Sequence, residues 1–161
     1  MLVRRSVWWL TVLLVIPGQC LADDTAAAAM SAAPQISVYR DASCGCCSKW
    51  VQHLRRHGFS IDDHVVTDMQ SVKSRYQVPP HLASCHTAVI DGYVIEGHVP
   101  ADDILSLIRE RPAVAGLSVP GMPAGSPGME MPGRSDPYAV YSFGRDGSAE
   151  IYDLYPATGA Q

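Results

Sequence analysis

The residues with the clearest capacity for chemistry are cysteines. Three of the five fall within four positions, at Cys44, Cys46 and Cys47, and a fourth occurs at Cys85. The fifth, Cys20, lies in the N-terminal stretch that reads as a signal peptide and is expected to leave with it. Thiolates bind soft or borderline ions such as Cu(I) and Zn(II), and they also exchange disulfides. The sequence therefore predicts a metal site or a thiol–disulfide centre at these positions.

The spacing of the cysteines favours a site for several metal ions. Cys46 and Cys47 are adjacent, and a bridge between neighbours would strain the geometry that a disulfide requires. On a helix, adjacent side chains diverge by about 100°, so they grip one tetrahedral ion poorly and bridge several ions more easily. A multinuclear thiolate cluster, with Cys85 delivered from a neighbouring strand, fits this spacing best. We predict all four cysteines as its ligands.

Two other interpretations stay open. Cys44 and Cys47 form a C-x-x-C pair, which is typical of thiol–disulfide oxidoreductases, although Cys46 and Cys85 then have no function. The other alternative is a structural zinc module, since most four-cysteine sites hold zinc with two separate pairs of ligands. This chain instead offers three cysteines together and one apart.

Three further residues are second-tier candidates for metal binding. His98 falls between a predicted strand and the last predicted helix, at the end of the sheet where site loops gather in thioredoxin-like proteins. Met122 and Met129 occur in a loop rich in Gly and Pro, where burying them is difficult, and thioethers select Cu(I) over harder ions. We therefore include these three residues as contributors of lower rank.

Other histidines carry less signal. His53 and His57 share one helical face, but His53 is about 10 Å along the axis from Cys46, so we expect both histidines to be solvated. His86 directly follows Cys85. In a strand it would face the opposite side and pack or hydrogen-bond there.

The elements that position these residues are predicted to form one α/β domain over residues 35–115. Apolar alternation and helical periodicity give the order strand, helix, strand, helix, strand, strand, helix. The first helix is predicted to begin at the cysteines, with Asp41 or Ser43 as its cap, and to end at Gly58. Its positive end should lower the pKa of the thiols there. This order is the minimal thioredoxin-like arrangement, a central mixed sheet with flanking helices.

Turn residues and composition define the other parts. Asp91-Gly92 predicts a hairpin between two strands of the domain. Residues 116–136 are rich in Pro, Gly and Met, which predicts a loop. Two aromatic-rich stretches then flank Asp146-Gly147, which predicts a C-terminal β-hairpin over residues 137–155, packed on the same domain.

The N-terminal residues predict export. Arg4 and Arg5 precede an apolar run, and residues 1–22 read as a signal peptide cleaved after Ala22. The run is shorter than the about 20 apolar residues that a membrane anchor needs, so we expect a periplasmic chain without an anchor. Residues 23–34 are rich in alanine and predict a disordered leader. The formal net charge of −4 argues against nucleic acid as a partner.

These motifs together resemble the periplasmic copper-resistance proteins of the CopG family. The similarity extends from Ile36 to about Met131. It rests on four motifs, namely Cys44-Gly45-Cys46-Cys47-Ser48-Lys49-Trp50, Ser84-Cys85-His86-Thr87, Gly92-Tyr93 with Glu96-Gly97-His98-Val99-Pro100, and Pro120-Gly121-Met122-Pro123 with Gly125-Ser126-Pro127-Gly128-Met129-Glu130.

The resemblance implies a thioredoxin-like fold, export to the periplasm and a role in copper resistance. It implies copper, chiefly Cu(I), held by Cys44, Cys46, Cys47 and Cys85 as a thiolate-bridged cluster. It also suggests cycling between Cu(I) and Cu(II), which would make the protein a copper oxidoreductase, and exchange of copper with other periplasmic copper-handling proteins. Thioredoxin itself has a cis proline before the third strand, and the segment around Cys85 takes that place here. This difference looks like the opening of a ligand position and disfavours generic disulfide exchange.

Overall fold

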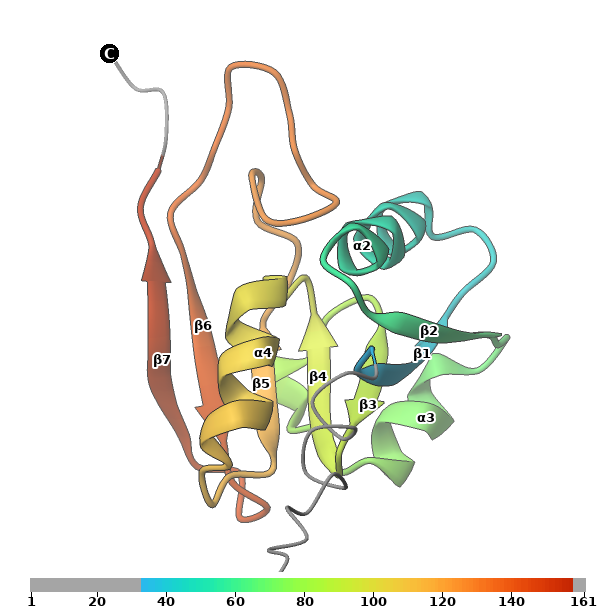
Figure 1. Cartoon of the computed structure of the whole chain (residues 1–161), viewed down its shortest axis with the longest axis vertical. Helices are drawn as coiled ribbons and strands as arrows, with labels where there is room; N and C mark the ends of the chain where they lie inside the picture. The colour runs from blue at the N-terminus through green and yellow to red at the C-terminus, as the bar shows by residue number, and fades with distance from the viewer. Residues whose placement is uncertain (1–32, 158–161) are drawn as a thin grey trace, which may run out of the picture. The chain divides into compact units, whose positions relative to one another are not determined.

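The chain folds around one mixed β-sheet with helices packed against it (Figure 1). The computed structural model describes residues 33–157. Its elements are β1 (Gln35–Arg40), α2 (Gly45–Arg56), β2 (Ser60–Val65), α3 (Met69–Arg75), the short 3-10 helix η1 (Pro80–Leu82), β3 (Thr87–Ile90), β4 (Tyr93–Gly97), α4 (Ala101–Glu110), β5 (Gly116–Val119), β6 (Tyr138–Phe143) and β7 (Ala149–Tyr155). The predicted signal peptide, residues 1–22, and the predicted leader up to residue 32 lie outside the described residues.

The strand order in the sheet is β2-β1-β3-β4-β5-β6-β7. β1 runs parallel to β2 and antiparallel to β3, β3 and β4 form an antiparallel hairpin, and β4 runs parallel to β5. The antiparallel strands β6 and β7 extend the sheet at its far edge. The predicted α/β class with a central mixed sheet is confirmed, and the order of elements from β1 to α4 is compatible with a thioredoxin-like arrangement.

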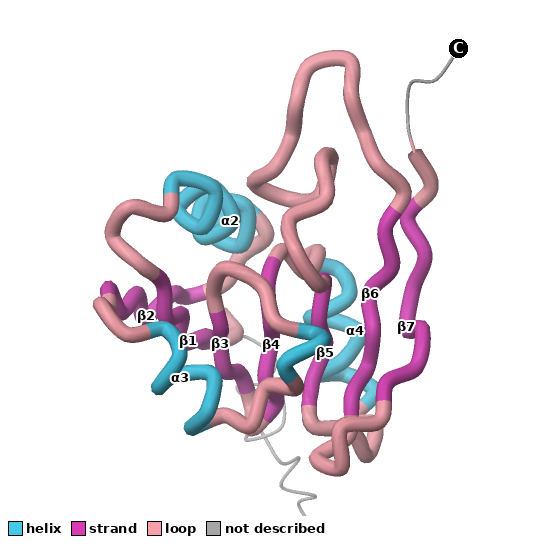
Figure 2. The backbone as a smooth tube through the Cα atoms, turned by 180° about the vertical axis from the view of Figure 1, so that it is seen from behind, coloured by secondary structure: helices cyan, strands magenta, loops and turns pink. Residues whose placement is uncertain are grey.

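The larger core lies between the sheet and the helices α2 and α4. Trp50 and Leu54 project from α2 at helical spacing, and Ile104 and Leu107 project from α4. They pack against apolar strand residues, including Leu117 of β5. In Figure 1, α4 lies in front of the sheet at β5, and in Figure 2, seen from the other side, it lies behind the sheet between β5 and β6.

A smaller core covers the opposite face of the sheet. Val94 belongs to this core, whereas its neighbour Ile95 belongs to the larger one, because successive side chains of a strand point to opposite faces. Leu82 of η1 and Val78, which follows α3, cover Val94 and Phe143 there. The sheet is therefore covered on both faces near β4, and the last four residues of that strand are buried.

The first turn of α2 differs in one detail from the prediction. The helix begins and ends as expected, and Gly58 follows it with a φ of +86°. Neither Asp41 nor Ser43 is the cap, however. Cys44 is the N-cap, and its sulfur accepts a hydrogen bond from the backbone N–H of Cys47. Asp41 instead accepts a hydrogen bond from the N–H of Ser43, which forms a local turn before the helix.

β5 was not predicted from the sequence. Residues 116–136 were predicted as loop, but Gly116–Val119 pairs with β4 on one side and β6 on the other. All four residues of β5 are buried, so the strand shows no alternation of apolar and polar residues. The non-strand segment begins at Pro120 and continues to Pro137, and the predicted C-terminal hairpin forms as β6 and β7.

Candidate metal centre

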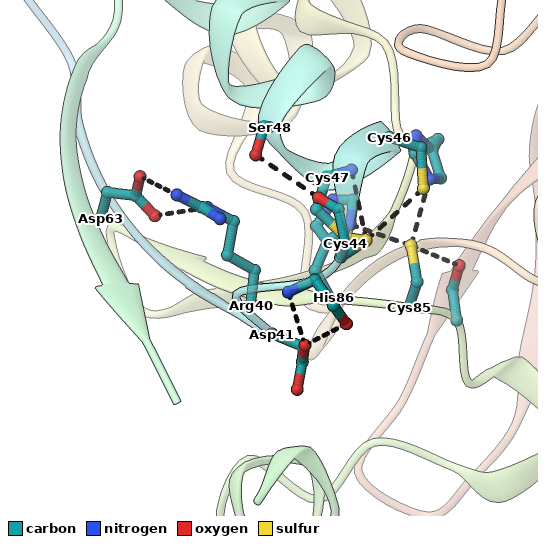
Figure 3. The surroundings of a disulfide bond; sticks show 12 residues. Arg40, Asp41, Cys44, Cys46, Cys47, Ser48, Asp63, Cys85 and His86 are labelled. Carbon is teal, nitrogen blue, oxygen red and sulfur yellow. Dashed lines mark hydrogen bonds and ion pairs between the residues drawn. A yellow bond between two sulfur atoms is a disulfide. The ribbon is translucent and has the colours of Figure 1, made fainter. Parts of the chain in front are cut away.

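The four cysteines predicted as ligands meet at one end of the sheet. Cys44, Cys46 and Cys47 lie at the start of α2, directly after β1. Cys85 lies just before β3, and because β3 runs antiparallel to β1, the start of one strand lies beside the end of the other. The four sulfur atoms lie within 4.8 Å of one another (Figure 3). The structure therefore brings together the whole predicted set.

Two of these cysteines are bonded to each other. Cys44 and Cys47 form a disulfide, with their Cα atoms 5.3 Å apart. Residues three apart on the first helical turn lie side by side, so this pair closes without any change in the helix. Cys46 and Cys85 are the free thiols of the described residues, and the sulfur of Cys46 lies 3.5 Å from that of Cys44. In the structure the site is therefore oxidised, with one disulfide and two thiols.

Cys85 lies among groups that keep it protonated when no metal is present. Burial raises the pKa of the Cys85 thiol to about 12, and the nearby sulfur of Cys46 adds to this effect. The general expectation of lowered thiol pKa values at the helix start does not extend to Cys85, which lies across from the helix on a different segment. A metal ion that binds Cys85 must displace its proton, so binding there releases a proton.

His98 faces Cys85 from the end of β4. Its Nε2 lies 3.1 Å from the sulfur of Cys85, and its Nδ1 lies 2.8 Å from the carbonyl oxygen of Pro127. A carbonyl oxygen only accepts, so Nδ1 carries the hydrogen and Nε2 presents its lone pair to Cys85. Burial lowers the pKa of His98, which favours this neutral form. His98 thus has the tautomer that a metal-binding histidine needs.

His86 is a site residue that was not predicted from the sequence. Its Nδ1 lies 3.2 Å from the sulfur of Cys85, so the expectation that it points away from Cys85 is wrong. The strand alternation used for that expectation does not apply, because Cys85 and His86 precede β3 instead of lying within it. Only an expectation that the segment before β3 is irregular could have indicated this contact.

The side chain of His86 is completely buried. It is 0 % exposed, and the centroid of its ring lies 4.4 Å from that of the Trp50 ring. Burial lowers its pKa well below the usual value, so the ring is neutral. Its Nε2 has no hydrogen-bond partner among the described residues. Cys85, His86 and His98 form a second group whose ligand atoms lie within 4.8 Å of one another.

His53 is also less solvated than predicted. Its Nε2 accepts a hydrogen bond from the backbone N–H of Ala101, the first residue of α4, at 3.2 Å. Burial is the main cause that lowers the pKa of His53 to about 4. His53 therefore joins α2 to α4, and within residues 33–157 it belongs to neither group of candidate ligands.

The segment after β5 covers the start of α2. Gly128 lies so close that a Cβ atom there would be 2.8 Å from the carbonyl oxygen of Cys46 and 2.8 Å from the nitrogen of Trp50. Its φ of +86° also favours glycine. The neighbouring carbonyl of Pro127 holds His98, so this segment orients one candidate ligand.

The two predicted methionines lie in the same segment. Met122 is 54 % exposed and Met129 is half-buried. Met122 follows Gly121, which pairs with Ser84 next to Cys85. Both residues are therefore in segments that border the site, and their role as ligands stays a prediction.

The donor set fits a soft metal ion. The two groups consist of four cysteines and two histidines, and no carboxylate belongs to either group among the described residues. Thiolate sulfur and neutral imidazole suit Cu(I) and Zn(II), whereas harder ions prefer oxygen ligands. Of the residues described, none belongs to a helix that is both long and apolar enough to cross a lipid bilayer. Fold and site define a thiol-rich α/β protein with a candidate soft-metal centre.

Comparison with known proteins agrees with this class. A solved structure titled "Copper resistance protein copG- Form 2" is 54% identical, with a TM-score of 0.74, and the match covers 77% of this chain and 99% of that one. "Copper resistance protein copG- Form 1" is 56% identical, with a TM-score of 0.73 and coverage of 76% and 98%. Residues 82–129 also match the family described as "Protein of unknown function, DUF411". No curated protein matches the chain. The chain belongs to the CopG family of copper resistance proteins.

Proposed function

We propose that this protein binds copper as part of copper resistance, and that it holds Cu(I) with the thiolates of Cys44, Cys46, Cys47 and Cys85. The observation that carries this proposal is the gathering of the four sulfur atoms within 4.8 Å of one another. In the reduced protein these four sulfurs form a soft donor set of the kind that binds Cu(I).

Several features support a site for more than one copper ion. Adjacent cysteines diverge on a helix, and the sulfur of Cys46 lies 3.5 Å from that of Cys44, so one thiolate can contact two ions. The neutral Nε2 of His98 offers a further ligand next to Cys85. Met122 and Met129 are contributors of lower rank, since thioethers also prefer Cu(I).

A second function is favoured by the disulfide between Cys44 and Cys47. Closing this disulfide takes two electrons and two protons from the thiols, which reduces two Cu(II) ions to Cu(I) or one disulfide in another protein. Reopening it requires a thiol reductant that supplies two electrons. We therefore propose oxidoreductase activity at this pair, with Cu(II) as the first substrate to test and a disulfide of another protein as the alternative substrate.

We propose that the protein acts in the periplasm, after cleavage of residues 1–22, and without a membrane anchor. The support is the charged and apolar pattern of those residues together with the family to which the chain belongs. Copper ions are its partners in this proposal, and other periplasmic copper-handling proteins would deliver or accept them.

The test is an anaerobic Cu(I) titration of the reduced chain beginning at Asp23, competed against a chromogenic chelator. We expect more than one Cu(I) per chain, with a thiolate-to-copper absorption band that reaches its endpoint at the same ratio. The Cys85→Ser variant should lose part of this stoichiometry. An unchanged stoichiometry in Cys85→Ser would contradict the four-thiolate site, and one tightly held zinc per chain would indicate the structural zinc module instead.

The oxidoreductase activity has its own test. Reduced protein mixed with Cu(II) should form two Cu(I) ions for each disulfide, as measured by a Cu(I)-specific chelator and by the loss of titratable thiols. Efficient reduction of insulin by the apoprotein, together with no uptake of copper, would support a general disulfide oxidoreductase and contradict copper binding.

A further inference from the structure

We propose that Glu96 is a positioning residue for the copper site, because its buried carboxylate holds the residues on both sides of Cys85 and His86. One oxygen, Oε1, accepts a hydrogen bond from the backbone N–H of Ser84 at 2.6 Å. The other oxygen, Oε2, accepts a hydrogen bond from the hydroxyl of Thr87 at 2.7 Å. This inference rests on the proposed function, since it concerns the same site.

The carboxylate lies in a place where it cannot be solvated. Glu96 is 0 % exposed and is balanced by Lys73 of α3, whose Nζ lies 2.5 Å from Oε1. Lys73 also donates to the Thr87 hydroxyl at 3.2 Å. Burying an ion pair is costly unless its geometry and hydrogen bonds are good, so a merely structural contact would be served as well by apolar side chains. The buried charge of Glu96 therefore needs a functional explanation, and its hydrogen bonds to Ser84 and Thr87 indicate one.

The segment that Glu96 holds, residues 84–87, makes few other hydrogen bonds. Cys85 and His86 precede β3 and so lie outside the ladder of regular strand hydrogen bonds. Ser84 makes two further contacts through its hydroxyl, to the carbonyl of Gly121 and to the sulfur of Cys85 at 4.0 Å. The His86 carbonyl accepts a hydrogen bond from the N–H of Gly97. Glu96 is thus the one group of the described residues that is hydrogen-bonded both to Ser84 and to Thr87.

The face of the sheet on which the Glu96 side chain lies explains why it acts indirectly. Glu96 and Thr87 are paired across β3 and β4, and their side chains point to the face covered by α3. The ligands gather at the end of the sheet, so Glu96 itself contacts no candidate ligand atom. It acts through the backbone, fixing the place from which the Cys85 sulfur projects toward Cys46. Groups that orient metal ligands commonly change metal affinity by about 10- to 100-fold when they are removed.

The test combines Glu96→Gln with Cys85→Ser in the reduced chain. In the Gln variant one carboxylate oxygen becomes an amide that donates, so the side chain can no longer accept from both Ser84 and Thr87. We expect Glu96→Gln to weaken Cu(I) binding about tenfold or more in the wild-type background. In the Cys85→Ser background it should change Cu(I) affinity by less than about twofold, because the two effects share one ligand. If Glu96→Gln weakens Cu(I) binding by the same factor in the wild-type and Cys85→Ser backgrounds, or leaves it unchanged in the wild-type background, the proposal is overturned.

A measurement without metal separates this proposal from copper binding itself. A hydrogen bond to a carboxylate shifts the Ser84 amide proton downfield and slows its exchange with solvent. We expect Glu96→Gln to move this resonance upfield and to speed its exchange in the apoprotein. An unchanged Ser84 resonance would overturn the positioning role even if copper binds as proposed. Equal copper binding by wild type and Cys85→Ser would instead show that the copper site is wrong, whatever the Ser84 resonance reports.

Two further variants keep the proposal testable if Glu96→Gln does not fold or is generally destabilised. Thr87→Val is close in shape and removes only the hydroxyl bonded to Oε2, so it should fold and show a smaller loss of Cu(I) affinity that again disappears with Cys85→Ser. Tyr155→Phe is the matched control, since it removes a side-chain hydrogen bond to Asp103 from the edge strand β7, three strands away from β4 in the sheet. It should lower stability without changing Cu(I) affinity. A loss of affinity in Tyr155→Phe as large as that in Glu96→Gln would reduce the effect to general destabilisation and overturn the proposal.

Discussion

Replacing Gly128 by alanine tests whether the segment after β5 is packed on the copper site. Gly128 has a φ of +86°, and an added Cβ would lie 2.8 Å from the Cys46 carbonyl oxygen and 2.8 Å from the Trp50 nitrogen. Both are backbone atoms of α2 and cannot move aside as a flexible side chain would. The segment must therefore shift away from the helix, and the hydrogen bond from His98 to Pro127 should lengthen.

The magnitude of this change has two parts. A left-handed backbone costs an alanine about 1 kcal/mol relative to glycine. Forcing an extra carbon into a tightly packed contact costs about 1–3 kcal/mol more. We therefore expect Gly128→Ala to lower the free energy of unfolding by about 3 kcal/mol. Loss of the group that orients His98 should also weaken Cu(I) binding by about tenfold.

Gly133 supplies a matched control in the same segment. Its φ is +68°, but nothing lies within 4 Å of the position that a Cβ would take. Gly133→Ala should therefore cost about 1 kcal/mol, from the backbone alone, and leave Cu(I) affinity unchanged. The difference between the two variants isolates the packing of the segment on α2.

The assays are urea unfolding of the reduced apoprotein and Cu(I) competition with a chromogenic chelator. Equal losses of stability in Gly128→Ala and Gly133→Ala, together with equal Cu(I) affinity, would contradict both expectations. That result would mean that the segment does not pack on the start of α2, and that the Pro127 carbonyl does not orient His98.

Three further results are expected from the same structure. The pKa of His53 is about 4 in the folded protein and about 6.5 in the unfolded chain, so the stability that neutral His53 contributes is complete above about pH 6.5 and is lost as the pH falls toward 4. After a discount for its partial exposure, we expect this contribution to be about 1–2 kcal/mol, measured by urea unfolding as the difference between wild type and His53→Gln. A difference that does not vary with pH would contradict this expectation. Trp50 lies 4.4 Å from the ring of His86, and the other two tryptophans are in the predicted signal peptide, so copper binding should quench the fluorescence of the processed chain with the same endpoint as the thiolate absorption band. Unquenched fluorescence at full loading would place the metal elsewhere. The oxidised chain, with Cys44 and Cys47 bonded, should bind fewer Cu(I) ions than the reduced chain in a chelator competition without reductant, and equal numbers would show that these two sulfurs are not ligands.

Local patterns in the sequence were sufficient for many of the elements. The helix after the cysteines forms where apolar spacing predicts it, with Trp50 and Leu54 buried. The hairpin at Asp91-Gly92 forms because both residues adopt positive φ, at 48° and 86°, which Asp and Gly tolerate best. β5 was missed because a short strand buried on both faces has no alternating pattern.

The sequence by itself determined that the chain carries a soft-metal donor set, because ligand chemistry depends on residue type and local spacing, and both can be read from the chain. Only the tertiary structure decided which groups surround Cys85. His86 and His98 reach its sulfur because an irregular segment, a strand end and a loop carbonyl converge there. The pairing of Lys73 with Glu96 spans 23 residues and depends on α3 lying on the face of the sheet to which the Glu96 side chain points. Contacts of this kind depend on how segments far apart in the sequence pack together, which the pattern within one segment does not encode.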